Sequence, residues 1–320
     1  MLPIKPSWRH YVYIARPDHW VKHVFILPGI VIGIALSPIL PVTNILFNCV
    51  VGFVSACLVA SANYVINEWL DAASDKHHPE KSSRPAANGL LRAEYVYLEY
   101  AILAVLGIGL AYMVNMLFLQ VSLALLISGI TYNVKPFRTK DKVYVDVLSE
   151  AINNPIRLVM GWAMVSSHSI PPVSLVAAYW AGGAFLMAAK RLSEYVFIVS
   201  KNGDDAPGLY RRSFVFYSVE SLIISCFVYA LTSAFGIAVF LIKYRAEFIF
   251  TFPVIIVLFA YYLHLGLKPV SVAQKPEHLH NDGRLMFIVL LLVVVSVACA
   301  FIDLPQVERI IQSRFVEFTP

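Results

Sequence analysis

The chain has 320 residues, of which 59% are hydrophobic and only 14% are charged, and its mean hydropathy is +0.70. This composition excludes a pair of soluble domains, which the length alone would allow, and is typical of a protein that crosses a membrane several times. The net charge of +5 suits an anionic membrane surface and anionic substrates. Nucleic-acid binding is not indicated, because the basic residues are spread over several short segments beside apolar runs.

Nine apolar runs long enough to span a bilayer follow one another along the chain. They lie near residues 24–40, 44–66, 95–113, 115–133, 145–165, 170–189, 213–240, 246–267 and 285–303. A transmembrane barrel would show short alternating segments instead of continuous runs. The sequence therefore predicts an all-α polytopic membrane protein, a bundle of nine transmembrane helices in a single domain, 1–320. We expect a cytoplasmic N-terminal segment, 1–22, and a short C-terminal tail, 304–320.

Lys and Arg are distributed very unequally between the two sides of this predicted bundle. The N-terminal segment and the connections after the second, fourth, sixth and eighth runs hold 20 of the 25 basic residues, counted on the sequence. Basic connections stay in the cytoplasm. We therefore predict an integral protein of a bacterial-type inner (cytoplasmic) membrane, with its active site facing the cytoplasm.

Three metal-competent side chains, Asn67, Asp71 and Asp75, follow the second apolar run at four-residue spacing. On a helix this spacing places them in one stripe about 12 Å long. Carboxylate and amide oxygens are ligands that Mg²⁺ prefers, and substrate phosphates usually complete its shell. The stripe predicts a Mg²⁺ site for a diphosphate, with Asp71 and Asp75 as catalytic ligands. The alternative is a solvated acidic helix end.

A basic segment follows the acidic stripe and contains His77, His78, Lys81 and Arg84. Lys and Arg neutralise the phosphate oxygens that a metal leaves free, and Arg offers a planar fork for two of them. We assign Lys81 to substrate binding and Arg84 to catalysis, with a topology signal as the alternative. The histidines are expected to be loop residues, because hard oxygen ligands favour Mg²⁺ over Zn²⁺.

A second group of polar side chains extends from the fourth run into the fifth. Its members are Tyr132, Lys135, Asp146, Glu150, Asn153, Asn154 and Arg157. Polar groups on an otherwise apolar segment must face a bundle interior or a water-filled cavity, and an intramembrane arginine usually has a function. The alternative is an ion pair between Arg157 and Glu150 that only fixes helix packing. Pro155 predicts a kink in this segment.

The end of the sixth run carries Lys190, Arg191 and Glu194. The two cations are either site residues or partners of the helix dipole and the lipid headgroups.

Together these motifs resemble the UbiA-type superfamily of intramembrane prenyltransferases over nearly the whole chain. The resemblance rests on Asn67-x-x-x-Asp71-x-x-x-Asp75, on His78-Pro79-x-Lys81-x-x-Arg84-Pro85 and on Tyr132-x-x-Lys135. It implies a bundle of nine helices with a lateral opening to lipid, in which Mg²⁺ promotes ionisation of a C–O bond to diphosphate.

Three further motifs resemble the decaprenyl-phosphate phosphoribosyltransferase branch of this superfamily. They are Arg16-Pro17-x-x-Trp20-Val21-Lys22, Lys190-Arg191-x-x-Glu194, and Pro276-Glu277 with Asp282. The aromatic prenyltransferases typically carry a second Asp-rich motif after helix six, where this chain has Lys190 and Arg191.

The resemblance implies transfer of 5-phosphoribosyl from phosphoribosyl pyrophosphate to a polyprenyl phosphate, with release of pyrophosphate. Asp71 and Asp75, helped by Asn67, would hold Mg²⁺ on the diphosphate. The implied cations for the diphosphate are Lys81, Arg84 and Lys135, and those for the acceptor phosphate are Lys22, Lys190 and Arg191. The remaining expected substrate-binding residues are Tyr132, Asp146, Glu150, Asn154, Arg157 and Glu194.

Two other functions remain open. The same Mg²⁺ site could transfer a polyprenyl group from a prenyl diphosphate to an aromatic or other small acceptor, and a membrane transporter is the alternative from another class. The expected partners are a polyprenyl phosphate or prenyl diphosphate, a phosphorylated or aromatic small-molecule co-substrate and the lipid bilayer, with no nucleic acid.

Overall fold

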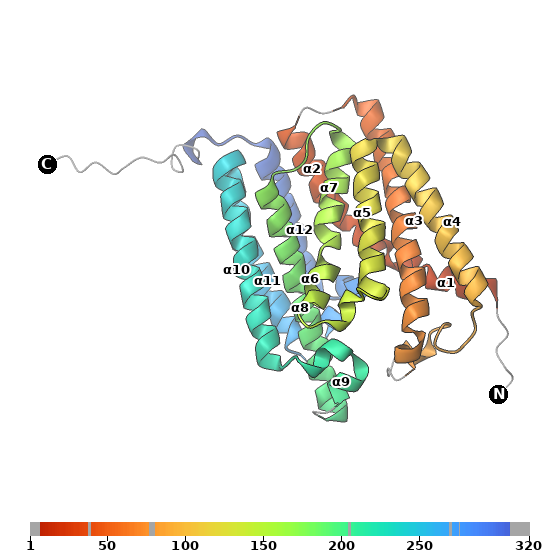
Figure 1. The fold of residues 1–320 in the computed structure, drawn as a ribbon. Coiled ribbons are helices and arrows are strands. Elements are labelled where there is room, and N and C mark those ends of the chain that lie inside the picture. The colour runs from red at the N-terminus through yellow and green to blue at the C-terminus, as the bar shows by residue number, and fades with distance from the viewer. Residues whose placement is uncertain are drawn as a thin grey trace.

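The computed structural model describes residues 7–37, 40–76, 81–203, 206–268, 271–274 and 276–307. Within these ranges the regular structure is entirely helical. Long helices stand side by side in one bundle, with the chain crossing it repeatedly from end to end (Figure 1). The predicted all-α membrane fold is confirmed.

The first half of the bundle is built from helices whose limits are set by proline, asparagine and serine caps. Its elements are α1 (Trp8–Ile14), the 3-10 helix η1 (Pro17–Ile26), α2 (Leu27–Leu36), α3 (Val42–Asp75), η2 (Lys81–Ser83), α4 (Ala93–Val114) and α5 (Met116–Asn133). Ser7 and His10 form a capping box that starts α1. Asn115 separates α4 from α5, and its side chain accepts a hydrogen bond from the Phe118 N–H at 2.9 Å.

The second half contains one broken helix and four long ones. Its elements are η3 (Thr139–Asp141), α6 (Val145–Ala151), α7 (Asn153–Val165), α8 (Val173–Asn202), α9 (Ala206–Tyr210), η4 (Arg212–Val215), α10 (Val219–Tyr244), η5 (Ala246–Thr251), α11 (Phe252–Gly266), η6 (Val272–Gln274), η7 (Pro276–Asn281) and α12 (Gly283–Phe301). The break between α6 and α7 lies at Ile152, three residues before Pro155. Proline lacks the N–H that would bond back to Ala151, so the kink predicted there is confirmed.

Eight helical segments in the described part of the chain are long and apolar enough to cross a membrane. The remaining predicted span, the fifth at 145–165, corresponds to α6 and α7 together, each of which is too short alone. Two helices continue well beyond their predicted apolar runs, α3 to Asp75 and α8 to Asn202. The polar motifs therefore lie on the last turns of these helices and not in loops.

The backbones of α2 and the end of η1 are in direct contact with the backbone of α7. A Cβ on Gly29 would lie 2.0 Å from the Leu158 carbonyl oxygen, and one on Gly161 would lie 2.1 Å from that of Ile26. Small residues that allow such close approach are typical of helix packing in membranes. The contact brings α7, and Arg157 on it, next to η1.

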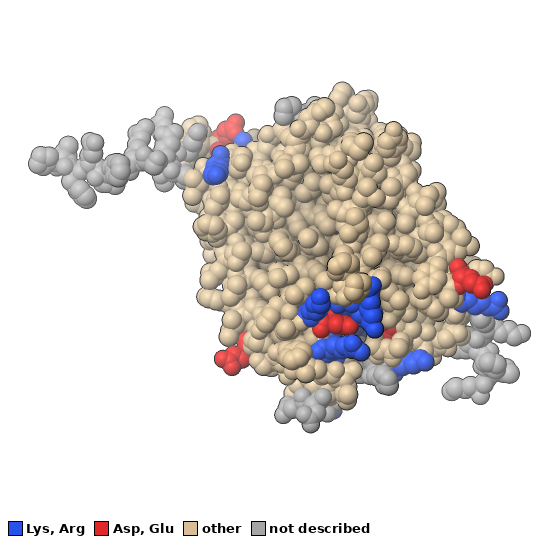
Figure 2. Space-filling model, viewed as in Figure 1, with Lys and Arg blue, Asp and Glu red and all other residues tan. Residues whose placement is uncertain are grey.

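The charged residues gather at one end of the bundle. The α3–α4 connection, the α5–α6 connection and α9 all lie at this end, which is the lower end in Figure 1. Figure 2 shows Lys, Arg, Asp and Glu crowded together there, below a face that is otherwise uncharged up to the opposite rim. The grouping agrees with the predicted clustering of basic connections on one side. The assignment of that side to the cytoplasm stays a prediction.

Candidate active site

The predicted acidic stripe forms the end of α3 and is surrounded by cations. We call this group the aspartate cluster: Asn67, Asp71, Asp75, Arg84, Asn133, Arg138 and Lys140. Oδ1 of Asp71 accepts hydrogen bonds from Lys140 and, at 3.3 Å, from Arg138. Oδ2 of Asp75, which is buried, accepts a hydrogen bond from Arg84 at 2.7 Å. Asn67 donates a hydrogen bond to the Asn133 side chain.

The turn η3 supplies two of these cations. Arg138 adopts a left-handed backbone conformation with φ 32°, and its side chain donates to Asp141 at 2.9 Å and to the Asn133 carbonyl oxygen at 3.2 Å. Lys140 is buried, and this burial lowers its pKa although Asp71 opposes the shift. Lys135, which was expected to neutralise oxygens of the diphosphate, is exposed in the structure. The cations that contact Asp71 are instead Arg138 and Lys140.

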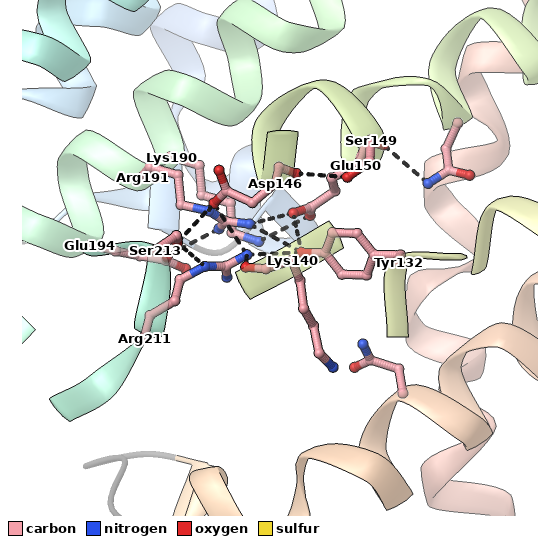
Figure 3. Close-up of polar contacts among 12 residues, drawn as sticks. Tyr132, Lys140, Asp146, Ser149, Glu150, Lys190, Arg191, Glu194, Arg211 and Ser213 are labelled. Carbon is pink, nitrogen blue, oxygen red and sulfur yellow. Dashed lines mark hydrogen bonds and ion pairs between the residues drawn. The ribbon is translucent and has the colours of Figure 1, made fainter. Parts of the chain in front are cut away.

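A second group surrounds Arg191 on α8 and joins residues of α5, α6, α8 and η4, with Arg211 directly before η4. We call it the arginine cluster: Tyr132, Asp146, Glu150, Lys190, Arg191, Glu194, Arg211 and Ser213 (Figure 3). The guanidinium of Arg191, 1% exposed, donates to Asp146 at 3.4 Å, to Glu194 at 3.1 Å and to Glu150. Lys190 lies 3.9 Å from Glu150. The structure thus brings together the predicted residues of α5, α6 and α8.

Asp146 is fully buried and accepts hydrogen bonds from three described residues, one of them Arg191. Ser213 donates to it at 3.1 Å and Tyr217 at 2.8 Å, while Arg211 lies 3.4 Å away in an ion pair. Arg211 also donates to the hydroxyl of Tyr132 at 3.0 Å, and Tyr132 in turn donates to Glu150 at 3.0 Å. Burial and Arg191 act to lower the pKa of Arg211, but Tyr132, Asp146 and Glu194 raise it overall, so its charge is fixed. Arg211 is one of the basic residues in the connection after the sixth apolar run, and nothing in its spacing along the sequence indicates a site residue.

One lysine, Lys81, interacts with both clusters, and another, Lys22, interacts with Lys190. The charge of Lys81 on η2 interacts with Asp75 of the aspartate cluster and with Glu194 and Lys190 of the arginine cluster. Lys190 also interacts with the charge of Lys22 on η1. Burial lowers the pKa of Lys81 to about 8. Among the predicted cations, Lys190 is therefore near enough to both Lys81 and Lys22 for their charges to interact.

Arg157 and Asn154 of α7 lie apart from this network. Among the described residues no carboxylate lies within 4.0 Å of Arg157, so the expected alternative of an Arg157–Glu150 pair is not found; Glu150 pairs with Arg191 and Lys190 instead. Arg157 is beside Tyr64 and Tyr179. The buried side chain of Asn154 lies against Gly183 of α8, where an added Cβ would be 2.2 Å from its Nδ2.

Glu68 is a buried carboxylate that sequence analysis did not single out. Glu68 is 2% exposed, and the backbone of Ala86 lies beside its side chain. Neither carboxylate oxygen has a hydrogen-bond partner in the described structure. Seven residues are nearly two helical turns, so Glu68 and Asp75 share a face of α3. This spacing was the signal that could have identified it.

The oxygens of α3 fit a Mg²⁺ ion that substrate phosphates complete. Oδ2 of Asp71 and Oδ1 of Asp75 accept no hydrogen bond from the described residues, and the oxygens of Glu68 are also without one. Within the described ranges no three Asp, Glu, His or Cys side chains converge into a metal site by themselves. The protein therefore offers an incomplete hard-oxygen set, which suits Mg²⁺ bridged to a diphosphate.

Some residues of the predicted motifs lie outside this description. His77, His78 and Pro79 are outside the described residues, as are the side chains of Pro276 and Glu277. Asp282 caps α12, where its carboxylate accepts a hydrogen bond from the Leu285 N–H at 2.9 Å and others from the Tyr261 hydroxyl.

Solved structures share this fold. The chain superimposes on a UbiA homologue from Archaeoglobus fulgidus, solved bound to DMAPP and Mg²⁺, with a TM-score of 0.67 over 94% of this chain and 99% of the other, at 19% identity. At this identity the likeness establishes the fold alone.

Curated relatives cover a smaller part of the chain. It is 26% identical over 179 residues to decaprenyl-phosphate phosphoribosyltransferase from Mycobacterium tuberculosis, matching 56% of this chain and 58% of that one. The enzyme of the same name from Corynebacterium glutamicum is 28% identical over 188 residues, with 56% and 52% covered. The chain thus spans little more than half the length of these relatives.

The family comparison covers most of the chain. Residues 24–291 match the UbiA prenyltransferase family, a range that contains both clusters and every span except the first turns of the bundle and the last turns of α12. The chain therefore belongs to the UbiA prenyltransferase family, and it is an integral membrane transferase, as its motifs predict.

Proposed function

We propose that the protein transfers a 5-phosphoribosyl group from phosphoribosyl pyrophosphate to a polyprenyl phosphate and releases pyrophosphate, with the polar end of the bundle in the cytoplasm. The observation that carries this proposal is the proximity of three lysines, in which Lys190 is near enough to both Lys81 and Lys22 for their charges to interact. Like charges brought together from three separate elements repel one another, so their convergence suits a site that receives more than one phosphate group. The names of the relatives from two organisms support the same reaction.

The donor diphosphate would lie at the aspartate cluster. Asn67, Asp71 and Asp75, together with Glu68, would hold Mg²⁺, which supplies a Lewis acid for the departing pyrophosphate. Arg84 and Lys140 would turn from their carboxylate partners toward phosphate oxygens, because phosphate offers them the same charge-assisted hydrogen bonds.

The acceptor phosphate would lie at Lys190 and Lys22. One of its oxygens attacks C1 of the ribose, the C1–O bond to the diphosphate breaks, and the leaving pyrophosphate keeps the electron pair. A phosphate oxygen is already anionic at neutral pH, so no general base is required. Arg191 holds Glu150, Glu194 and Asp146 in place and has no side-chain surface left for substrate, since it is 1% exposed.

A prenyl transfer to a small acceptor is the second candidate. It is supported by the family and by the ligand of the structural relative, DMAPP with Mg²⁺. The aspartate cluster would serve either donor, because both leave as a diphosphate.

Release of pyrophosphate by the purified protein tests the proposal. One arm contains phosphoribosyl pyrophosphate and a polyprenyl phosphate, and the other a prenyl diphosphate and an aromatic acid, each with Mg²⁺ and with EDTA. We expect Mg²⁺-dependent release in the first arm. Release of pyrophosphate only in the second arm would favour prenyl transfer. Absence of release in both arms would favour the transporter alternative.

A further inference from the structure

A buried polar layer centred on Arg157 lies deeper in the bundle than either cluster. Arg157 is 7% exposed and His23 of η1 is 3% exposed, and the two interact electrostatically. The Tyr64 side chain from α3 and the Tyr179 side chain from α8 lie beside the guanidinium. Four separate elements, η1, α3, α7 and α8, thus converge on one arginine.

The charge of Arg157 is not balanced by the protein. Its Nη1 donates to the Asn153 carbonyl oxygen at 3.4 Å, while its Nε has no hydrogen-bond partner, and Nδ1 of His23 also has none. No carboxylate in the described ranges forms an ion pair with it. A buried cation without a counter-ion is strongly unfavourable, so a site that retains one is expected to receive an anion.

The layer stands at a defined depth below the aspartate cluster. Tyr64 and Asp71 are seven residues apart on α3, which is about 10 Å along the helix axis. A ribosyl 5-phosphate is shorter than this from its C1 oxygen to its phosphorus, and the metal and the diphosphate between Asp71 and the sugar would make up the difference. A ligand whose diphosphate lies at Asp71 and Asp75 could therefore place a second phosphate beside Arg157.

We propose that Arg157, with Tyr64, Tyr179 and His23, forms the binding site for the 5-phosphate of the phosphoribosyl donor. The inference rests on the proposed function. It assigns a polar layer to the phosphate monoester at one end of the donor, while the aspartate cluster binds the diphosphate at the other. A prenyl diphosphate would instead direct a hydrocarbon chain away from its diphosphate and would leave Arg157 without a counter-ion.

Calorimetric titration of the purified protein in lipid nanodiscs tests the assignment. The probes are phosphoribosyl pyrophosphate, ribose 5-phosphate and pyrophosphate, each with Mg²⁺. We expect Arg157→Met to weaken binding of phosphoribosyl pyrophosphate and of ribose 5-phosphate at least tenfold, and binding of pyrophosphate less than twofold. Tyr64→Phe is expected to give a smaller loss with the same selectivity.

The results separate this inference from the function on which it rests. If the wild-type protein binds prenyl diphosphate but not phosphoribosyl pyrophosphate, the proposed function and the inference both fail. If it binds phosphoribosyl pyrophosphate, and Arg157→Met weakens all three probes equally or none of them, the inference alone fails.

Stability of the ligand-free protein supplies an independent readout. Because the charge of Arg157 is uncompensated, Arg157→Met should melt no lower than the wild type. Arg245→Met is a matched control at the other end of the bundle, where Arg245 lies 3.8 Å from Glu247 and 2.9 Å from Asp303. It should destabilise the fold and leave all three affinities unchanged. A ligand-free Arg157→Met protein that melts well below the wild type would contradict the absence of a counter-ion.

Discussion

Replacement of Arg191 by Met is expected to unfold the polar end of the bundle before it affects substrate binding. Arg191 is 1% exposed and pairs with Asp146, Glu150 and Glu194, of which Asp146 is fully buried. Removing one partner of a buried ion pair leaves an uncompensated charge and destabilises a protein by about 3–5 kcal/mol. Lys190 forms one ion pair within the described part of the chain, 3.9 Å from Glu150, so Lys190→Met should cost about 1 kcal/mol or less.

Thiol labelling during heating measures this difference in detergent or nanodiscs. The buried residues Cys226 and Cys299 react with a fluorogenic maleimide only when the bundle opens. Arg191→Met should label at a clearly lower temperature than the wild type, whereas Lys190→Met should stay close to it. A double variant with Asp146→Gln would recover part of the loss, because it removes one of the stranded charges. Equal labelling temperatures for the two single variants would refute the reasoning that Arg191 holds the cluster together.

Three further predictions concern the proposed reaction. Asp71→Ala or Asp75→Ala should lower turnover by about two to three orders of magnitude, since metal stabilisation of a leaving group contributes several kcal/mol; near-normal turnover with an intact fold would remove these ligands from the mechanism. The pKa of Lys81 is lowered to about 8, so its positive charge is present below that pH and is lost as the pH rises through it. The KM for the donor should therefore rise above about pH 8 in the wild type and stay flat in Lys81→Arg, and parallel profiles would contradict this role. Lys190→Gln should raise the KM for polyprenyl phosphate severalfold more than that for the donor, and the reverse order would place the acceptor elsewhere.

The fold and the acidic stripe could be predicted from sequence because each depends on a local period. Apolar runs of spanning length identified the helices, and four-residue spacing placed Asn67, Asp71 and Asp75 on one face of α3. The ends of helices were less predictable, because hydropathy changes at the membrane surface while backbone hydrogen bonding does not. This is why α8 continues through Lys190 and Arg191 to Asn202.

Contacts that depend on turns or breaks could not be predicted in the same way. Glu150 and Arg157 are seven residues apart and would share a face of a continuous helix, but the break at Ile152 separates them. Lys140 and Arg138 contact Asp71 through a turn with a left-handed residue, a geometry that no spacing rule indicates. Arg211 reaches Asp146 only through the tertiary fold.

Transfer of label from phosphoribosyl pyrophosphate into the lipid phase tests the central proposal most directly. The purified protein would be incubated with Mg²⁺, ribose-labelled donor and a panel of polyprenyl phosphates of different chain length, and the products extracted into organic solvent. We predict labelled polyprenyl-phosphoribose, which disappears with EDTA and in the Asp71→Ala variant. The absence of labelled lipid with every polyprenyl phosphate, together with efficient prenylation of an aromatic acid by the same preparation, would contradict the proposal.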